Sequence, residues 1–253
     1  MKRLTIYICF TLISLTGFGW GQTGHRAVGL IAERHLTAKA RKNIAKILGQ
    51  QSLAEVGTWM DEVRSDSTFN YMSDWHWVTI ETGKTYDQSP KNPKGDVIAT
   101  LEKIIAELGR HTLDKKAETD RVKILVHLVG DIHQPLHVGC CDDQGGNKVK
   151  VKWFRSESNL HRVWDSDMID DTRLSFTELA DFLGEPDAAL AVEWQKKSVR
   201  DWADESMALR RAVYETGDGN LGYKYAYKHW PEAKLRMLQA GLRLAAVLNQ
   251  IYG

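Results

Sequence analysis

The sequence from His127 to His137 reads HLVGDIHQPLH, and the rest of the chain is organised around it. It overlaps an apolar run, residues 124–129, whose helical period places His127 and Asp131 on one face, about 40° apart. Pro135 ends the helix, so the chain turns just before His137, which can approach the same region from another direction. An imidazole and a carboxylate on a buried face are costly unless something compensates them. A metal ion would do so, although one such pair is more often a cap or an ion pair.

A second pair with the same spacing strengthens the metal interpretation. Residues 159–165 read NLHRVWD and place His161 and Asp165 four residues apart. Five of the nine histidines and three aspartates then become candidate ligands, namely His25, Asp61, His76, His127, Asp131, His137, His161 and Asp165. Zinc takes about four ligands from histidine nitrogen and aspartate oxygen, so eight side chains indicate more than one ion. No metal is assigned to the other histidines, which are His35, His111, His133 and His229.

Length and composition indicate one exported domain. The chain has 253 residues, of which 43% are apolar, and no repeat or Pro/Gly-rich linker divides it. Residues 1–19 contain Lys2 and Arg3, then an uncharged run and small residues, as in a secretory signal peptide. We expect cleavage between Gly19 and Trp20, export, and a single domain over residues 20–253. An uncleaved membrane anchor is the alternative, but this segment is only weakly apolar.

The charge of the exported part excludes one class of nucleic-acid binding. Without residues 1–19 the chain has 32 basic and 33 acidic side chains. A nearly neutral protein does not grip polyanions by a broad basic surface, so any phosphate site must be local. Cys140 and Cys141 are adjacent. Because neighbouring cysteines seldom bridge each other, we expect no disulfide framework.

The remaining pattern is mainly helical. Apolar spacing predicts helices over residues 26–36, 37–48, 97–108, 120–134, 175–183, 187–203, 205–215 and 223–249. Residues 84–96 include two prolines and predict an exposed loop, while residues 149–154 alternate like one arm of a hairpin. The predicted fold is therefore mainly α, a single-domain multi-helix bundle with at most a small β-hairpin. We expect the helices after Asp165 to supply core and no chemistry.

Together these motifs resemble a known family. They are Trp20 with His25, the segments WMDEVR (59–64) and DWHWV (74–78), the central stretch, GGN (145–147) and NLHRVWD, in family order. The chain resembles the secreted S1/P1-type nucleases, which are zinc-dependent and specific for single strands, and which share their helical fold with bacterial zinc phospholipases C. The resemblance covers essentially all of residues 20–253 and implies the phospholipase C/P1 nuclease fold.

The resemblance also implies a role for each candidate residue. One zinc ion would be held by Asp61, His76, His127 and Asp131. A second would share Asp131 and take His25 with the amine and carbonyl of Trp20, and a third would take His137, His161 and Asp165. Arg64 matches the family position beside the scissile phosphate. Trp77 matches the position of an aromatic residue on which a base stacks, and Asn147 matches an asparagine that helps to define this base pocket. Thr79 departs from the acidic residue of fungal members, so the base preference does not carry over.

The implied activity is hydrolysis of single-stranded DNA or RNA to 5′-phosphorylated products, with 3′-nucleotidase activity. A hydroxide bridging the zinc ions linked by Asp131 would be the nucleophile, because zinc lowers the pKa of its water to about 7. Stacking on Trp77 is worth roughly 1–3 kcal/mol per base and is available only to an unpaired base. A zinc phospholipase C is the alternative enzyme, and a zinc-stabilised binding protein without turnover is the alternative class. We expect a monomer without a stable protein partner.

Overall fold

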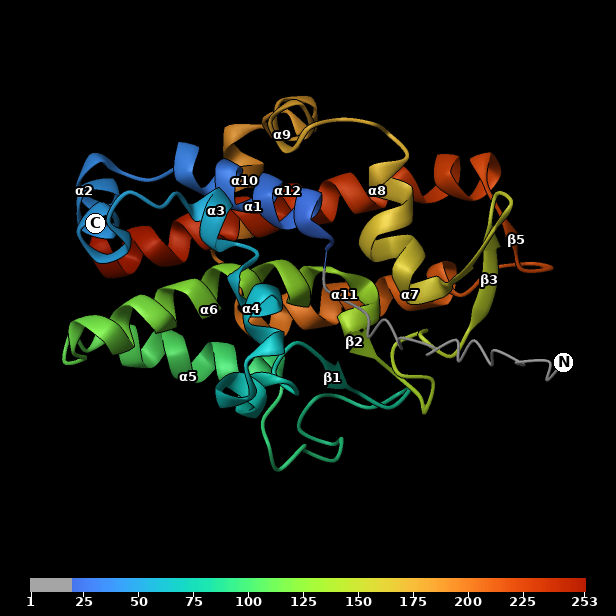
Figure 1. The fold of residues 1–253 in the computed structure, drawn as a ribbon, viewed down its shortest axis with the longest axis horizontal. Coiled ribbons are helices and arrows are strands. Elements are labelled where there is room, and N and C mark those ends of the chain that lie inside the picture. Colours follow the sequence, from blue (N-terminus) through green and yellow to red (C-terminus); the bar gives the residue numbers. More distant parts are fainter. Residues whose placement is uncertain (1–19) are drawn as a thin grey trace, which may run out of the picture.

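The structure is a computed structural model that describes residues 20–253, so the expected signal peptide lies outside the described residues. Long helices lie side by side along the molecule (Figure 1). The longest, α12 (Tyr223–Tyr252), packs against α1 (Gln22–Arg34) and α6 (Lys115–His133). The prediction of a mainly α fold is confirmed. Within the described part, no helix has the length and hydropathy needed to cross a bilayer.

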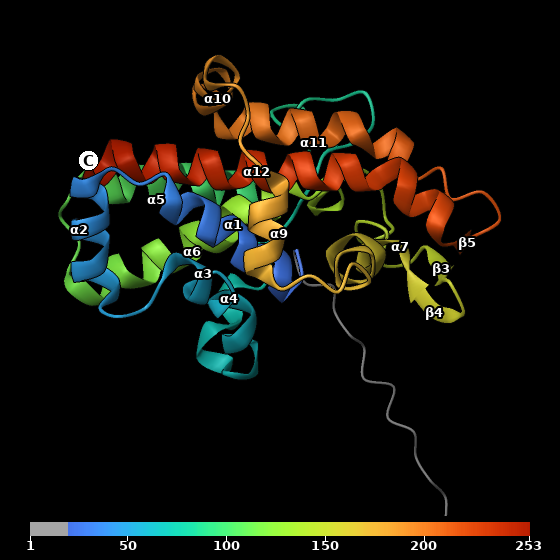
Figure 2. The ribbon, with the colours of Figure 1, turned by 90° about the horizontal axis from the view of Figure 1, so that it is seen from above.

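The two ends of the bundle differ (Figure 2). One end holds the last turn of α12 and α2 (Ala38–Leu48), whose N-cap Thr37 accepts a hydrogen bond from the Ala40 amide. The strands β3 (Lys150–Trp153), β4 (Ser156–Asn159) and β5 (Asn220–Leu221) lie at the opposite end. Short helical segments connect the longer ones, and they are α3 (Leu53–Val56), α4 (Trp59–Glu62), the 3₁₀ helices η1 (Val63–Ser65), η2 (Ser67–Met72) and η3 (Pro135–His137), α7 (Leu160–Arg162), the π-helix η4 (Val163–Asp167), α8 (Met168–Asp170) and α9 (Phe176–Leu183).

Within residues 20–253, five short strands form two small sheets. In the first, β1 (Val78–Thr79) pairs in parallel with β2 (Val138–Gly139). In the second, β3 (Lys150–Trp153) pairs with the antiparallel β4 (Ser156–Asn159) and with the parallel β5 (Asn220–Leu221). The predicted hairpin arm is therefore β3. The sequence analysis did not predict the two-residue strands, because so short a run carries no alternation.

Three predicted helices had wrong bounds, for reasons of capping. Helix α6 begins at Lys115 rather than 120, because the Asp114 side chain accepts a hydrogen bond from the Ala117 amide. The predicted helices 187–203 and 205–215 are instead α10 (Ala188–Gln195) and α11 (Val199–Val213). Ser198 begins α11 through a capping box with Asp201, so the break falls six residues before the predicted one.

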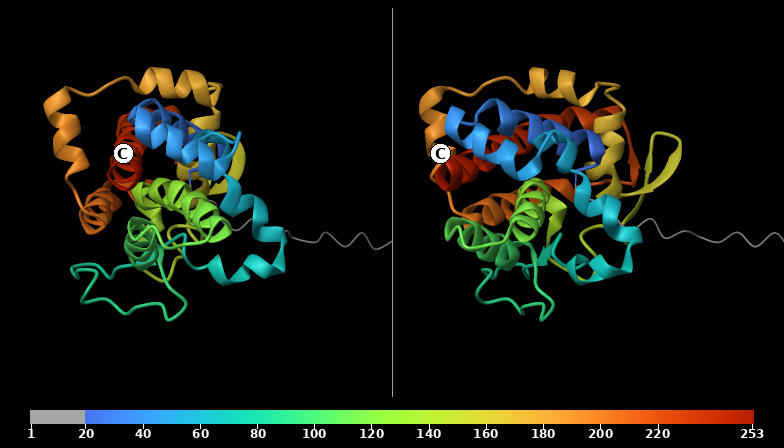
Figure 3. Two further views of the ribbon diagram at one scale, coloured as in Figure 1. Left: turned by 90° about the vertical axis from the view of Figure 1, so that its left-hand side faces the viewer. Right: turned by 60° about the vertical axis from the view of Figure 1, so that its left-hand side comes forward.

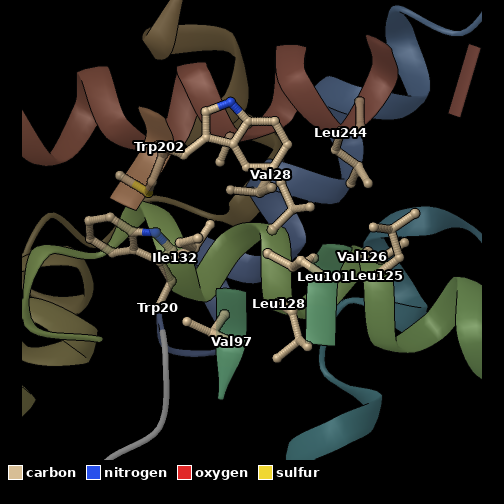
Figure 4. Packing of buried hydrophobic residues seen from close by; sticks show 14 of the residues in the cluster. Trp20, Val28, Val97, Leu101, Leu125, Val126, Leu128, Ile132, Trp202 and Leu244 are labelled. Carbon is tan, nitrogen blue, oxygen red and sulfur yellow. The ribbon is translucent and has the colours of Figure 1, made fainter. Parts of the chain in front are cut away.

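Helix α6 lies in the middle of the bundle, between α5 (Val97–Gly109) on one side and α1 and α12 on the other (Figure 3). All of its residues from Ile124 to His133 are buried. Apolar side chains from the surrounding helices and Trp20 pack around it (Figure 4). Any polar group on this part of α6 is therefore removed from water and needs a partner inside the protein.

Candidate metal centre

The last turns of α6 carry the first two candidate ligands. His127 and Asp131 are fully buried, and His127 Nε2 lies 3.3 Å from Asp131 Oδ2. The helix ends at His133, and the 3₁₀ helix η3, which starts with Pro135, turns the chain back. His137 Nδ1 thereby comes to 3.8 Å from Asp131 Oδ1. One helix and the turn after it thus bring three of the predicted ligands together.

Asp131 is the centre of a group of candidate ligands from four separate segments. His76 Nδ1 lies 2.9 Å from Asp131 Oδ2, and His25 Nε2 lies 3.3 Å from Asp131 Oδ1. Asp61 Oδ1 is 3.8 Å from His127 Nε2. We call Asp61, His25, His76, His127 and Asp131 the Asp131 group. Each of its two overlapping triads has ligand atoms within 4.8 Å of one another, so each can hold an ion.

A glycine makes room for one member of this group. Gly130 precedes Asp131, and a Cβ at Gly130 would come within 2.7 Å of His25 Nδ1. Helix α1 presents His25, and a side chain at position 130 would push that ring away from Asp131. The glycine in HLVGDIH is therefore a requirement of the close approach of α1 to α6.

His137, His161 and Asp165 form a second group, which we call the Asp165 group. His161 Nε2 lies 3.1 Å from Asp165 Oδ2, and His137 Nε2 lies 3.7 Å from Asp165 Oδ1. Their ligand atoms also lie within 4.8 Å of one another. His161 is in the short helix α7, whereas Asp165 lies in the π-helix η4. The pair predicted to share one α-helical face therefore lies in a wider-wound turn.

Backbone carbonyls orient three of the histidines in the same way. His127 Nδ1 lies 2.7 Å from the Gly57 carbonyl oxygen. At the same distance, His137 Nδ1 faces the His76 carbonyl oxygen, and His161 Nδ1 faces the Gly145 carbonyl oxygen. Because a carbonyl only accepts, each Nδ1 carries a proton, so Nε2 is the nitrogen through which each ring, in its neutral form, can bind a cation. His76 differs, since its Nδ1 faces Asp131.

Several buried polar atoms in the two groups make no hydrogen bond within the described residues. They are both ring nitrogens of His25, Asp131 Oδ1, His137 Nε2 and Asp165 Oδ2. Orphaned buried acceptors are costly, and a cation among them would remove that cost. Histidine nitrogen and aspartate oxygen are zinc ligands, so the donor set fits that ion.

The charges of the groups follow from burial and proximity. Burial, reinforced by His127, lowers the pKa of His25, and burial lowers the pKa of His76 to about 4. Burial also acts on His137, but the Asp131 and Asp165 carboxylates outweigh it and raise its pKa to about 9. Burial disfavours the Asp131 carboxylate, yet neighbouring histidines hold its pKa well below its ordinary value. Asp131 is therefore an anion at neutral pH.

Trp20 is buried close to both groups. A Cβ at Gly130 would lie 3.8 Å from Trp20 Cδ1, on the same side as His25. The next residue, Gly21, donates its amide to the Asp165 carbonyl at 2.5 Å. The start of the described chain is thus fixed between the segments that carry Asp131 and Asp165. Whether the Trp20 amine is a ligand depends on the bond to residue 19, which lies outside the described residues.

The predicted substrate residues border the groups. Arg64 Nη2 lies 3.1 Å from Asp61 Oδ1, and the Arg64 side chain is 27% exposed. Trp77 follows His76 and is 40% exposed, enough to present a ring face to a ligand. Asn147 is half-buried and donates to the Gln144 carbonyl at 2.9 Å. The loop of Asn147 also supplies the Gly145 carbonyl that orients His161.

Two features were missed or predicted wrongly. Gln134 Nε2 donates to Asp165 Oδ1 at 2.5 Å and so links the central stretch to the second group. The glutamine beside Pro135 in HLVGDIHQPLH could have indicated this role. Cys140 and Cys141 are joined by a disulfide, which was not predicted. The bond closes one dipeptide and cross-links no distant segments.

A helical bundle with a buried cluster of imidazoles and carboxylates defines a protein able to hold several metal ions. The family model described as S1/P1 Nuclease matches residues 20–253. Endonuclease 4 of Arabidopsis thaliana is 29% identical over 92% of this chain and 89% of its own. Nuclease S1 of Aspergillus oryzae is 26% identical over 99% of this chain and 98% of its own length. Nuclease P1 of Penicillium citrinum is 26% identical over 92% of this chain and 98% of its own length. The chain therefore belongs to the S1/P1 nuclease family, which supports a hydrolase activity on nucleic acids.

Proposed function

We propose that the chain is an exported, zinc-dependent nuclease that hydrolyses single-stranded DNA and RNA to 5′-phosphorylated products, with 3′-nucleotidase activity. The observation that carries the proposal is the convergence of the Asp131 and Asp165 groups around shared segments of α6 and η3. His137 contacts the carboxylates of both groups, so ions in the two groups would act on one substrate phosphate.

The ligand atoms suit three zinc ions. Asp61, His76, His127 and Asp131 would hold the first. Asp131, His25 and the amine and carbonyl of Trp20 would hold the second, and His137, His161 and Asp165 the third. The buried position of Trp20 beside His25 supports this role. It requires cleavage after Gly19, and for that reason the proposal includes a signal peptide at 1–19, a single domain over 20–253 and export.

The residues around the ions have separate tasks in phosphodiester hydrolysis. Zinc, when bound, lowers the pKa of water and offsets negative charge on the phosphate and the leaving oxygen. The Arg64 guanidinium donates to a phosphate oxygen, and Asp61 holds it in place at 3.1 Å. Asp131, kept anionic by its histidine neighbours, joins the first two ion sites.

Base recognition would occur beside the Asp131 group. Trp77, half-exposed next to His76, offers a ring face on which an unpaired base stacks. Asn147 would border the same pocket, from the loop that orients His161. A paired base is already stacked within its duplex, which gives a physical cause for preferring single strands. Because Thr79 replaces an acidic residue, no base preference is proposed.

The test uses the processed chain that begins at Trp20, loaded with zinc. We expect cleavage of single-stranded DNA and RNA with 5′-phosphate products, slow cleavage of duplex DNA, and no release of phosphocholine from phosphatidylcholine vesicles. Phosphocholine release without nucleotide release would replace the proposal by a phospholipase C. Full zinc content without any turnover would favour a binding protein. A chain with residues added before Trp20 is the control, and we expect it to bind less zinc.

A further inference from the structure

Helix α11 and its C-cap carry three polar side chains at four-residue spacing, with Ser206 and Arg210 in the helix and Tyr214 at the C-cap. The sequence analysis assigned no chemistry to this helix. In the structure each of the three side chains hydrogen-bonds to a different segment that carries, follows or orients candidate metal ligands.

Ser206 contacts the end of α6. Its hydroxyl donates to the Ile132 carbonyl at 2.7 Å, one residue after Asp131. The last carbonyls of a helix have no donor within the helix, so this bond fixes the turn that presents Asp131. Arg236 Nη2 donates to the Ser206 oxygen at 2.8 Å, and Arg236 Nε donates to the His133 carbonyl at 3.1 Å. The hydroxyl is therefore held in one orientation.

Arg210 contacts the strands that follow His76 and His137. Its Nη1 lies 2.8 Å from the Ile80 oxygen, 3.2 Å from the Val138 oxygen and 2.7 Å from the Gly139 oxygen. A sheet of two two-residue strands is not stable by itself. The guanidinium is buried and forms no salt bridge among the described residues. Its hydrogen bonds to these carbonyls therefore join β1 and β2 at their ends.

Tyr214 contacts the loop that orients His161. Its hydroxyl donates to Asp143 Oδ2 at 2.6 Å. Two residues later, Gly145 has a φ of +59° and directs its carbonyl at His161 Nδ1, 2.7 Å away. A Cβ at Gly145 would meet the Leu136 oxygen, so the loop is wedged against η3. A small movement of Asp143 would therefore be transmitted to the orientation of the His161 ring.

We propose that Ser206, Arg210 and Tyr214 are positioning residues for the candidate metal centre. Ser206 fixes the position of the Asp131 group, and Tyr214 fixes the orientation of the Asp165 group. Arg210 holds together the strands that follow ligands of both groups. The inference rests on the proposed metal-dependent function, although its test does not require turnover. Partners that orient ligands from the second layer typically change metal affinity by about 10–100-fold when they are removed.

The test compares Ser206→Ala and Tyr214→Phe with Tyr252→Phe. Tyr252 also donates its hydroxyl to a carboxylate, Glu118 at 3.0 Å, but it lies at the other end of the bundle. Zinc retention is measured against a competing chelator, together with the melting temperature. We expect Tyr214→Phe and Ser206→Ala each to weaken retention of part of the zinc by roughly tenfold. Tyr252→Phe is expected to lower the melting temperature to a similar extent and to retain zinc as the wild type does.

An Asp165→Asn background assigns each effect to its group. There the Asp165 group no longer holds zinc, so Tyr214→Phe should add no further loss, whereas Ser206→Ala should still weaken the remaining zinc. Arg210→Lys keeps the charge but reaches fewer carbonyls, so it should weaken zinc binding by both groups. If Arg210→Lys does not fold, the zinc retention of Ser206→Ala and Tyr214→Phe decides the test.

Two results would overturn the proposal. One is wild-type zinc affinity in both Ser206→Ala and Tyr214→Phe. The other is an equal loss from every site in all variants, Tyr252→Phe included, which would indicate a merely structural role. Absence of nuclease activity in the wild type would refute the proposed function but leave these affinities interpretable, so the two failures are distinguishable.

Discussion

The Asp131 group and the Asp165 group begin from the same sequence spacing, a histidine and an aspartate four residues apart, yet they are built differently. His127 and Asp131 lie on a regular α-helix in the middle of the core. His161 and Asp165 lie across a short helix and a π-helix near the small sheet. Asp131 has three histidine nitrogens within 3.3 Å, whereas Asp165 has one. The same motif therefore gives a shared, central carboxylate in one case and a peripheral ligand in the other.

The comparison indicates which group is the foundation of the site. The Asp131 group draws on α1, α4, α6 and the turn before β1, so its geometry is set by the core. The Asp165 group depends on η3, on Gln134 and on the loop that contains Gly145. Loops carry fewer buried contacts than core helices and open more readily. We therefore expect substitution of Asp131 to remove more zinc and more activity than substitution of Asp165, and to affect more than one ion site.

The largest expected effect is that of Asp131→Ala. The substitution removes the carboxylate that two proposed ion sites share, and it leaves His25, His76 and His127 without their central anion. We expect loss of two of three zinc ions, measured by elemental analysis, and a fall in kcat of at least about a thousandfold. Asp218→Ala, an exposed aspartate bonded within its own turn, is the control. Retention of three zinc ions with normal turnover would refute the bridging role.

Asp165→Asn sharpens the contrast between the groups. The amide keeps the shape of the side chain but is a poor zinc ligand, so only the ion of the Asp165 group should be lost. We expect one zinc fewer per chain and a fall in kcat of roughly a hundredfold, the scale of one charge-stabilising contact. Loss of zinc from both groups would show that they are not separable.

Arg64→Ala tests whether chemistry beside the Asp131 group can be lost without the metal. Arg64 contacts Asp61 but offers no ligand atom, so zinc content should be unchanged. We expect kcat to fall by roughly tenfold to a hundredfold, with a smaller change in KM, because the contact strengthens as charge develops on the phosphate. An unchanged kcat would remove Arg64 from the mechanism.

The smallest expected effect is on the pH dependence of stability. The pKa of His137 is raised to about 9, whereas that of an unfolded histidine is about 6.5. In zinc-free protein, protonated His137 thus contributes stability that is complete below about 6.5 and is lost as the pH rises through 9. The pKa of His76 is lowered to about 4, so His76 does not titrate in that window.

The measurement is the melting temperature with and without zinc between pH 6.5 and 9. Zinc replaces the proton on His137, so the loaded protein should not lose this contribution. The gap between the two melting temperatures should therefore widen as the pH rises. His137→Asn is the control and should show a flatter profile. A gap that stays constant or narrows across this window would contradict the assignment of His137.

Spacing made part of the site predictable. The four-residue pairs, the proline after α6 and the position of His25 near the start of a helix identified the ligand candidates before any coordinates. The turn made by η3 follows directly from Pro135. What could not be read was which carbonyl each imidazole would meet, because Gly57 and Gly145 lie far along the chain from His127 and His161. Backbone carbonyls are the same at every residue and leave no sequence signal.

The helices after Asp165 show even more strongly that partners far along the chain cannot be predicted from the sequence. Their amphipathic pattern predicted core packing, and one face of α11 and of α12 is indeed buried, whereas α10 has no buried residue. Ser206, Arg210 and Tyr214, however, share one face with that core. Their partners are backbone carbonyls and one carboxylate that lie between 71 and 130 residues away in the chain.

The sequence by itself determined the helical architecture, the ligand types and the two short-range pairs, because helical period and capping are local properties of neighbouring residues. The tertiary structure decided how these pairs combine: that Asp131 lies at the centre, that His137 contacts both carboxylates, and that α11 supports both groups. The physical reason is that these contacts join segments far apart in the chain, and their geometry is set only when the core around α6 has packed.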